Sequence, residues 1–156
     1  MSASNFLMDA LKATGLRLTP QRVAICRLLE QVNGHPSAQE IYEILRPEYP
    51  SLSLATVYNT LESLVKAGAI NNLGTVSGGP ERFDALTGPH VNLACLRCQK
   101  VLDFPSPHVE DLQKEVQETS GYRLLGARVV YYGICPECQK KEINTRPPRS
   151  TSPAHA

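Results

Sequence analysis

The cysteines are the residues in this sequence whose spacing points most directly to chemistry. Four of the five form two CxxC pairs, Cys95-Leu96-Arg97-Cys98 and Cys135-Pro136-Glu137-Cys138. Each pair can present two thiolates from a tight turn, and four thiolates fill the tetrahedral shell that zinc prefers. A filled shell leaves no position for a substrate, so the sequence predicts a structural zinc site.

Two other interpretations of the cysteine pairs stay open. They could be redox dithiols, although the chain lacks the βαβ pattern that accompanies a thioredoxin-like CxxC, or they could hold iron as in rubredoxin. Disulfides are disfavoured because the N-terminus shows no signal peptide. The fifth cysteine, Cys26, falls within an amphipathic helical pattern and is expected to be a small buried side chain.

A second group of residues could bind a regulatory metal. His35, Asp84, His90 and Asp103 combine imidazole and carboxylate donors around a predicted hinge. Such a set suits Fe(II), Mn(II) or Zn(II). Taken singly, a loop histidine is often exposed or caps a helix, and an aspartate at a strand end is usually solvated. Spacing alone therefore leaves this metal site a hypothesis.

The elements that would position the first of these residues are helices followed by a hairpin. Thr19, Ser37 and Ser53 each precede an apolar helical stripe as an N-cap, and Ser37 with Glu40 forms a capping box. Residues 69–84 have the pattern of a short hairpin around a Gly-Gly-Pro turn. Helices followed by a two-stranded wing indicate a winged helix-turn-helix, with the helix after Ser53 as the reader.

The remaining residues are predicted to form a small second unit. Strands are expected at 91–94, 100–104 and 123–132, with a helix from Pro107 to about Ser120 that turns Val109, Leu112 and Val116 inward. The expected fold class is α+β: a winged helix-turn-helix domain over 1–84, a hinge over 85–89, and a small α/β unit with a four-cysteine zinc site over 90–144. The Pro/Ser/Arg-rich tail, 145–156, is predicted to be disordered.

Composition limits the possible functions. The 156 residues are 42% hydrophobic and 20% charged, which is typical of a globular protein. No apolar run approaches the roughly 20 residues that cross a bilayer, so we expect a cytoplasmic protein without a membrane partner. The net charge of +1 excludes nucleic-acid binding through bulk basicity, and DNA binding would need a focused patch.

At this point the chain resembles the Fur family of metal-dependent bacterial repressors. The resemblance is carried by Leu18-Thr19-Pro20-Gln21-Arg22, His35-Pro36-Ser37-Ala38, Leu54-Ala55-Thr56-Val57-Tyr58-Asn59-Thr60-Leu61, Arg82-Phe83-Asp84, His90-Val91-Asn92-Leu93-Ala94-Cys95 and the two CxxC pairs. It implies a winged-helix DNA-binding domain, a dimerisation domain with structural Zn(2+), and regulatory Fe(2+) or Mn(2+) at the hinge. His35, Asp84, His90 and Asp103 fall on the family's regulatory ligand positions.

One ligand position departs from the family pattern. Asn92 stands where a second histidine is usual, and an amide oxygen is a weaker and harder donor than imidazole. The substitution should lower metal affinity and favour Fe(II) or Mn(II) over Zn(II). Val57-Tyr58-Asn59 and Asp103 resemble the peroxide-sensing branch, which implies that peroxide oxidises His35 or His90 on an Fe(II) site.

The expected function is that of a metal-dependent transcriptional repressor and not an enzyme. A homodimer would read an inverted repeat in double-stranded DNA. The candidate DNA contacts are Ser53, Thr56, Tyr58, Asn59, Arg17, Arg22 and Arg82. The alternatives are an iron, manganese or zinc uptake regulator that does not sense peroxide, and a zinc-ribbon hydrolase or accessory subunit. For the hydrolase the sequence offers no third ligand histidine and no phosphate loop.

Overall fold

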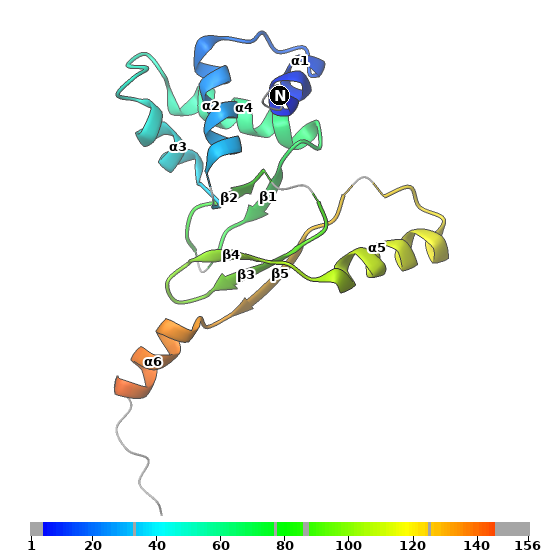
Figure 1. Ribbon diagram of the computed structural model, residues 1–156. Helices are drawn as coiled ribbons and strands as arrows, with labels where there is room; N and C mark the ends of the chain where they lie inside the picture. The colour runs from blue at the N-terminus through cyan, green and yellow to red at the C-terminus, as the bar shows by residue number, and fades with distance from the viewer. Residues whose placement is uncertain (1–4, 33, 77, 86–87, 125, 146–156) are drawn as a thin grey trace, which may run out of the picture.

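The computed structural model describes residues 5–32, 34–76, 78–85, 88–124 and 126–145. The elements run in the order α1 (Phe6–Ala13), α2 (Pro20–Gln31), α3 (Ala38–Leu45), α4 (Leu54–Lys66), β1 (Asn71–Gly74), β2 (Arg82–Asp84), β3 (Val91–Cys95), β4 (Val101–Phe104), α5 (Pro107–Ser120), β5 (Val129–Gly133) and α6 (Pro136–Thr145). Figure 1 shows α1–α4 at one end, the β1–β2 hairpin below them, and the β3–β5 sheet below the hairpin.

The three predicted N-caps are confirmed. The side chains of Thr19, Ser37 and Ser53 accept hydrogen bonds from the backbone N–H groups three residues later, at the starts of α2, α3 and α4. At α3 the carboxylate of Glu40 also accepts from the N–H of Ser37, which completes the capping box. These caps fix where each helix begins, and so where the loop containing His35 ends.

The main apolar core lies in the helical end of the molecule. Side chains from all four helices meet there, and Phe83 of β2 closes the core from below. Cys26 is fully buried in this core, as expected, and burial raises the pKa of its thiol to about 11. The hairpin is therefore packed onto the helices as a wing, and Asp84 follows directly on its buried Phe83.

The second unit is built on a three-stranded sheet of order β4-β3-β5. Strand β3 pairs antiparallel with β4 and parallel with β5. The register sets Asn92 opposite Asp103 and sets Leu93 opposite both Leu102 and Tyr131. Because side chains alternate between the faces of a sheet, Asn92 and Asp103 share one face and the three apolar side chains share the other.

The structure corrects several predictions for this second unit. Helix α5 runs over the predicted residues, but none of its side chains is buried, and Leu112 is 54% exposed rather than facing inward. Strand β5 begins at Val129 and not at residue 123. Helix α6 was not predicted, and it includes Thr145, which was assigned to the tail. The rest of that tail, 146–156, and hinge residues 86–87 lie outside the described residues.

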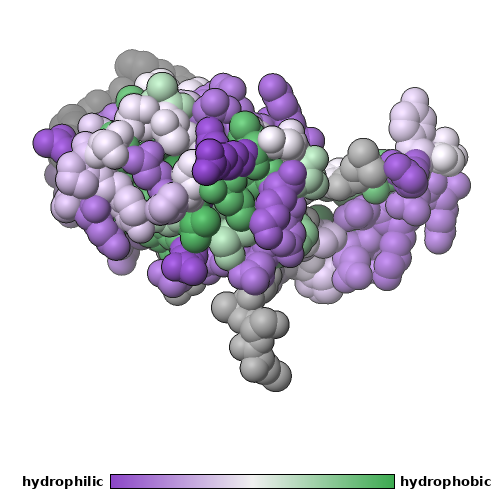
Figure 2. Space-filling view, turned by 90° about the horizontal axis from the view of Figure 1, so that it is seen from above, coloured by the Kyte–Doolittle hydropathy of each residue, from purple (hydrophilic) through white to green (hydrophobic). Residues whose placement is uncertain are grey.

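The outer surface is largely hydrophilic when viewed from the helical end. Figure 2 shows a band of hydrophobic side chains near the middle of this face, while α5 extends to one side under mostly hydrophilic side chains. Among the described helices, none has the length and apolar character needed to span a bilayer.

Candidate metal centres

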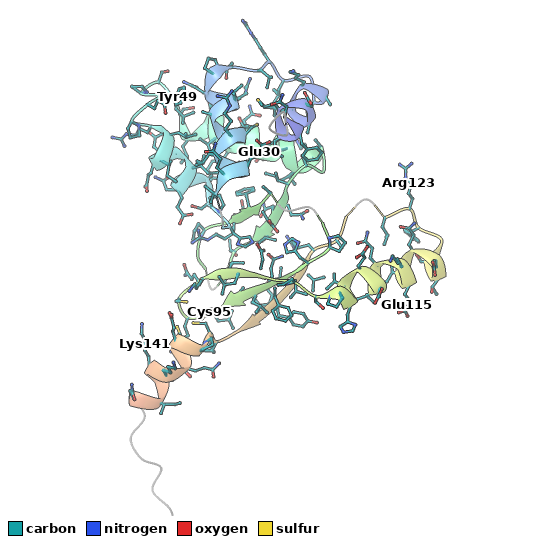
Figure 3. All side chains as sticks on the ribbon, in the orientation of Figure 1. Glu30, Tyr49, Cys95, Glu115, Arg123 and Lys141 are labelled. Atoms are coloured by element: carbon teal, nitrogen blue, oxygen red, sulfur yellow. The ribbon has the colours of Figure 1, made fainter. Side chains whose placement is uncertain are left out.

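The four paired cysteines meet at the far end of the sheet. Cys95 ends β3 and Cys98 lies in the turn that follows, while Cys135 immediately precedes α6 and Cys138 lies in its first turn. Their sulfur atoms all lie within 4.8 Å of one another. Figure 3 shows Cys95 beside the first turn of α6. The cluster thus fastens α6 to the sheet.

The geometry of this cluster fits zinc. The Sγ atoms of Cys98 and Cys135 are 3.8 Å apart, and a tetrahedral ion with Zn–S bonds of about 2.3 Å requires a separation of about 3.8 Å. The Sγ of Cys95 accepts the N–H of Cys135 at 3.3 Å. Backbone N–H groups, that of Cys135 foremost, lower the pKa of the Cys95 thiol to about 6, which favours the thiolate that a metal needs.

The second cluster lies between the helical unit and the sheet. His35 comes from the loop before α3, Asp84 ends β2, His90 precedes β3, and Asp103 lies on β4. The Nε2 of His35 is 2.9 Å from Asp103 Oδ1 and 3.9 Å from Asp84 Oδ2. The Nε2 of His90 is 2.7 Å from Asp84 Oδ2 and 3.4 Å from Asp103 Oδ1. Each histidine therefore faces both carboxylates.

The contacts of His90 favour a cation in this cluster. Its Nδ1 lies 2.7 Å from the carbonyl oxygen of Gly88, which can only accept, so Nδ1 carries a hydrogen. In the neutral ring, Nε2 then directs a lone pair at the Asp84 carboxylate, which is unfavourable unless a proton or a metal ion lies between them. Burial lowers the pKa of His90, but the Gly88 carbonyl and the two carboxylates outweigh it and the net shift is upward.

The donor set fits a divalent first-row ion. Two neutral imidazoles and two carboxylates would carry a charge that balances a dication, and mixed nitrogen and oxygen donors suit Fe(II) or Mn(II). His35 and Asp84 are buried, whereas the Asp103 side chain is 43% exposed. Asp103 borders a cleft of about 770 Å³ between α1, the end of α2 and β4, through which solutes can reach the donors.

Asn92 lies beside this cluster with an unused oxygen. The residue is 2% exposed and sits opposite Asp103 in the β3–β4 register. Its Nδ2 donates to the carbonyl of Val129 at 3.4 Å, but its buried Oδ1 has no hydrogen-bond partner among the described residues. A buried carbonyl oxygen without a partner costs about 1–3 kcal/mol, so any donor or cation that reached this Oδ1 would be stabilising.

The candidate DNA contacts lie in several environments. On α4, Tyr58 and Asn59 are exposed and Thr56 is half-buried, while the Ser53 hydroxyl caps the helix. Arg17 is exposed, and a guanidinium N–H of Arg22 donates to its carbonyl at 2.7 Å. Arg82 instead pairs with Glu40, with 2.6 Å between Nη1 and Oε2.

Two contacts between the helical unit with its wing and the sheet unit could not be predicted from any sequence motif. Arg128, just before β5, donates a hydrogen bond to the carbonyl of Asn72 on β1. The side chain of Gln99, in the first cysteine turn, lies so close to Gly79 that a Cβ at Gly79 would come within 2.5 Å of its Oε1. The wing thus approaches the sheet unit closely at two places besides the metal cluster, and at Arg128 the approach includes a hydrogen bond.

Comparisons with known proteins agree with this architecture. The model of the ferric uptake regulator family matches residues 13–132. The peroxide operon regulator of Bacillus subtilis (strain 168) is 37% identical over 135 residues, covering 86% of this chain and 92% of that protein.

Two solved structures are similar in fold. The Helicobacter pylori ferric uptake regulator, described as having three functional metal binding sites, has a TM-score of 0.69 and 28% identity, over 89% of this chain and 97% of that one. PerR from Streptococcus pyogenes, a structure described in terms of peroxide sensing and gene regulation, has a TM-score of 0.50 and 38% identity. The match covers 89% of this chain and 95% of that one.

Proposed function

Because the chain belongs to the ferric uptake regulator family, we propose that it is a metal-dependent transcriptional repressor that releases DNA in response to peroxide. The observation that carries the proposal is that the four candidate metal donors come from both structural units. His35 and Asp84 belong to the helical unit with its wing, whereas His90 and Asp103 belong to the sheet unit. A single ion bound to all four would therefore fix the two units relative to each other.

The control of DNA binding follows from this bridge. A ligand shifts a conformational equilibrium only by its difference in affinity between the two states. In this chain the metal would bind tightly only when the two units are close enough for all four donors to meet. We propose that this arrangement sets the spacing of the two α4 helices in a dimer to match an inverted repeat.

The DNA interface is proposed to centre on α4. Tyr58 and Thr56 can contact thymine methyl groups, Asn59 can hydrogen-bond a base edge, and Ser53 can contact a phosphate. Arg17, in the loop before α2, and Arg22, in the first turn of α2, are further phosphate candidates. Binding to DNA would place the protein in the cytoplasm.

A homodimer is supported by the exposed apolar face of the sheet. Leu93, Phe104, Leu112 and Tyr131 are all more than 40% exposed, and they surround a groove between the sheet and α5. This face lies opposite the one that holds Asp103. A second copy of the chain would cover it and would leave the metal cluster accessible.

Asn92 is proposed as the fifth donor, through its Oδ1, which has no hydrogen-bond partner in the part of the chain that the structure describes. Iron bound at the site would supply the reaction with peroxide. Oxidation of His35 or His90 would then remove a donor and release the bridge between the units. The amide in place of an imidazole supports a second candidate, an iron- or manganese-responsive regulator of the same family that does not sense peroxide.

Anaerobic DNA binding separates these candidates. The zinc-loaded protein would be titrated with Fe(II), Mn(II) or Zn(II) on an inverted-repeat site selected from a random library, and peroxide would then be added. A peroxide sensor should release DNA only in its Fe(II) form, with a mass gain of one oxygen on the peptide containing His35 or His90. DNA binding that survives peroxide with Fe(II) would instead establish the metal-responsive regulator.

A further inference from the structure

Three consecutive residues of β2 hold the loop that contains His35. The N–H of Phe83 donates to the carbonyl of Pro36 at 3.0 Å. The Nη1 of Arg82 donates to the carbonyl of His35 at 3.3 Å. Asp84 follows, with its carboxylate 3.9 Å from His35 Nε2. Strand β2 therefore contributes one metal donor itself and fixes the backbone of a second.

The guanidinium of Arg82 connects this loop to the start of α3. Its Nη1 also lies 2.6 Å from Oε2 of Glu40, the oxygen that accepts the N–H of Ser37 in the capping box. One cation thus contacts the backbone of His35 and the carboxylate that caps the helix after it. The side chain is 20% exposed, so water competes only partly for these bonds.

We propose that Arg82 is a positioning residue for the hinge metal, holding His35 in place through its carbonyl and Glu40, and that it is not a DNA phosphate contact. The inference rests on the proposed function, because it requires that His35 bind a metal. It replaces the role that sequence alone suggests for this arginine.

A positioning role and a purely electrostatic role for Arg82 predict opposite changes in metal affinity. Replacing Arg82 by Gln removes a positive charge near a cation site, and Coulomb's law alone predicts tighter metal binding. A positioning role predicts weaker binding, because His35 would lose its fixed orientation. Mutation of groups that orient metal ligands typically costs about 10–100-fold in affinity, so we expect Arg82→Gln to weaken Mn(II) binding about tenfold.

The test measures Mn(II) affinity and DNA binding separately on the zinc-loaded, full-length protein. Mn(II) binding would be followed by the electron paramagnetic resonance signal of free Mn(II), with Arg46→Gln as the control for charge loss at an exposed site on the same unit. DNA binding would be measured at saturating Mn(II) over a range of salt concentrations, with Arg17→Gln as a candidate phosphate contact for contrast.

The proposal predicts that Arg82→Gln raises the Kd for Mn(II) about tenfold while Arg46→Gln changes it less than twofold. At saturating Mn(II), the DNA affinity of Arg82→Gln and its salt dependence should match those of the wild type. An unchanged or tighter Mn(II) affinity would overturn the proposal. So would a loss of DNA affinity at saturating Mn(II) with a salt slope reduced by about one, the signature of a phosphate contact.

Two further variants keep the result interpretable. Arg82→Lys retains the charge but not the planar fork, and it should weaken Mn(II) binding to an intermediate extent even if Arg82→Gln does not fold. If this variant binds Mn(II) like the wild type, the proposal is wrong. His35→Ala tests the proposed site itself: if it binds Mn(II) as the wild type does, the hinge site fails, whatever Arg82 does.

Discussion

At the scale of single residues, the metal that the hinge cluster can bind depends on its donor atoms, which are two imidazole nitrogens and two carboxylate oxygens. The sequence predicts His35, Asp84, His90 and Asp103 as a set, and the structure brings their donor atoms within 4.8 Å of one another. Sequence could not predict that the Oδ1 of Asn92 would be buried without a partner among the described residues, because this depends on the strand register and on what faces β3. The ion pair between Arg82 and Glu40 could not be predicted either, because the two residues lie far apart in the sequence.

Asn92→Leu tests whether this amide is a ligand. Leucine has a similar volume and carries no polar atoms. It removes the unsatisfied Oδ1 together with the long bond from Nδ2 to Val129, so the two effects should largely cancel in the stability of the Mn(II)-free protein. Loss of a donor should weaken Mn(II) binding by at least about tenfold. Calorimetric titration and thermal melts measure the two effects.

Asn92→His provides the matched comparison for this prediction. An imidazole should restore Mn(II) binding and increase the preference for Zn(II), because nitrogen donors suit zinc better than amide oxygens do. If Asn92→Leu changes only the melting temperature and leaves Mn(II) affinity intact, Asn92 is not a ligand.

At the scale of elements, local signals predicted the helices better than the strands. The caps at Thr19, Ser37 and Ser53 act within one helical turn, so the starts of α2–α4 could be predicted from neighbouring residues. Strand β5 pairs with β3, far away in sequence, so its start at Val129 depends on a partner that local patterns do not contain. Helix α6 was missed because Pro136 was assigned to the cysteine turn and not to a helix start.

The capping box of α3 predicts a specific pH dependence. Burial raises the pKa of Glu40, but the Ser37 N–H and Arg82 outweigh it, and the net pKa lies below the usual 4.5. A lowered native pKa stabilises the fold above about pH 4.5, and this contribution is lost as the pH falls through the native pKa. The side chain is 46% exposed, so we expect only about 0.5 kcal/mol.

Denaturant unfolding of the wild type and Glu40→Gln between pH 3.5 and 7 measures this contribution. The difference in unfolding free energy should be constant above about pH 5 and should shrink below about pH 4.5. Loss of zinc at low pH affects both proteins alike and cancels in the difference. A difference that does not vary with pH would exclude an ionised Glu40 as the stabilising group.

At the scale of the whole molecule, the two faces of the β4-β3-β5 sheet lie in different environments. One face carries Asp103 and Asn92 toward the helical unit, and the other carries Leu93 and Tyr131 outward. The inward orientation predicted for Leu112 and Val116 was wrong for a single chain, because the pattern of an amphipathic helix does not say which surface covers it. In the proposed dimer, a second copy would provide that surface.

Leu93→Glu tests the dimer. Leu93 is 41% exposed at the centre of the apolar face, and a carboxylate there would be buried without a partner in a dimer. We expect light scattering to show a monomer that retains zinc and binds DNA poorly. Ile44→Glu, the same change at an exposed position of α3, should stay dimeric. A Leu93→Glu protein that remains dimeric would rule out this face as the interface.

The central claim is that one ion between the two units controls DNA binding, and Mn(II)-dependent DNA affinity tests it most directly. Binding of the selected inverted repeat would be measured with and without Mn(II) for the wild type, His35→Ala and His90→Ala, which remove one donor from each unit. We predict that Mn(II) tightens wild-type binding about 10–100-fold, that DNA tightens Mn(II) binding by the same factor, and that both variants lose this coupling while keeping zinc. Equal DNA affinity with and without Mn(II) in the wild type would contradict the account.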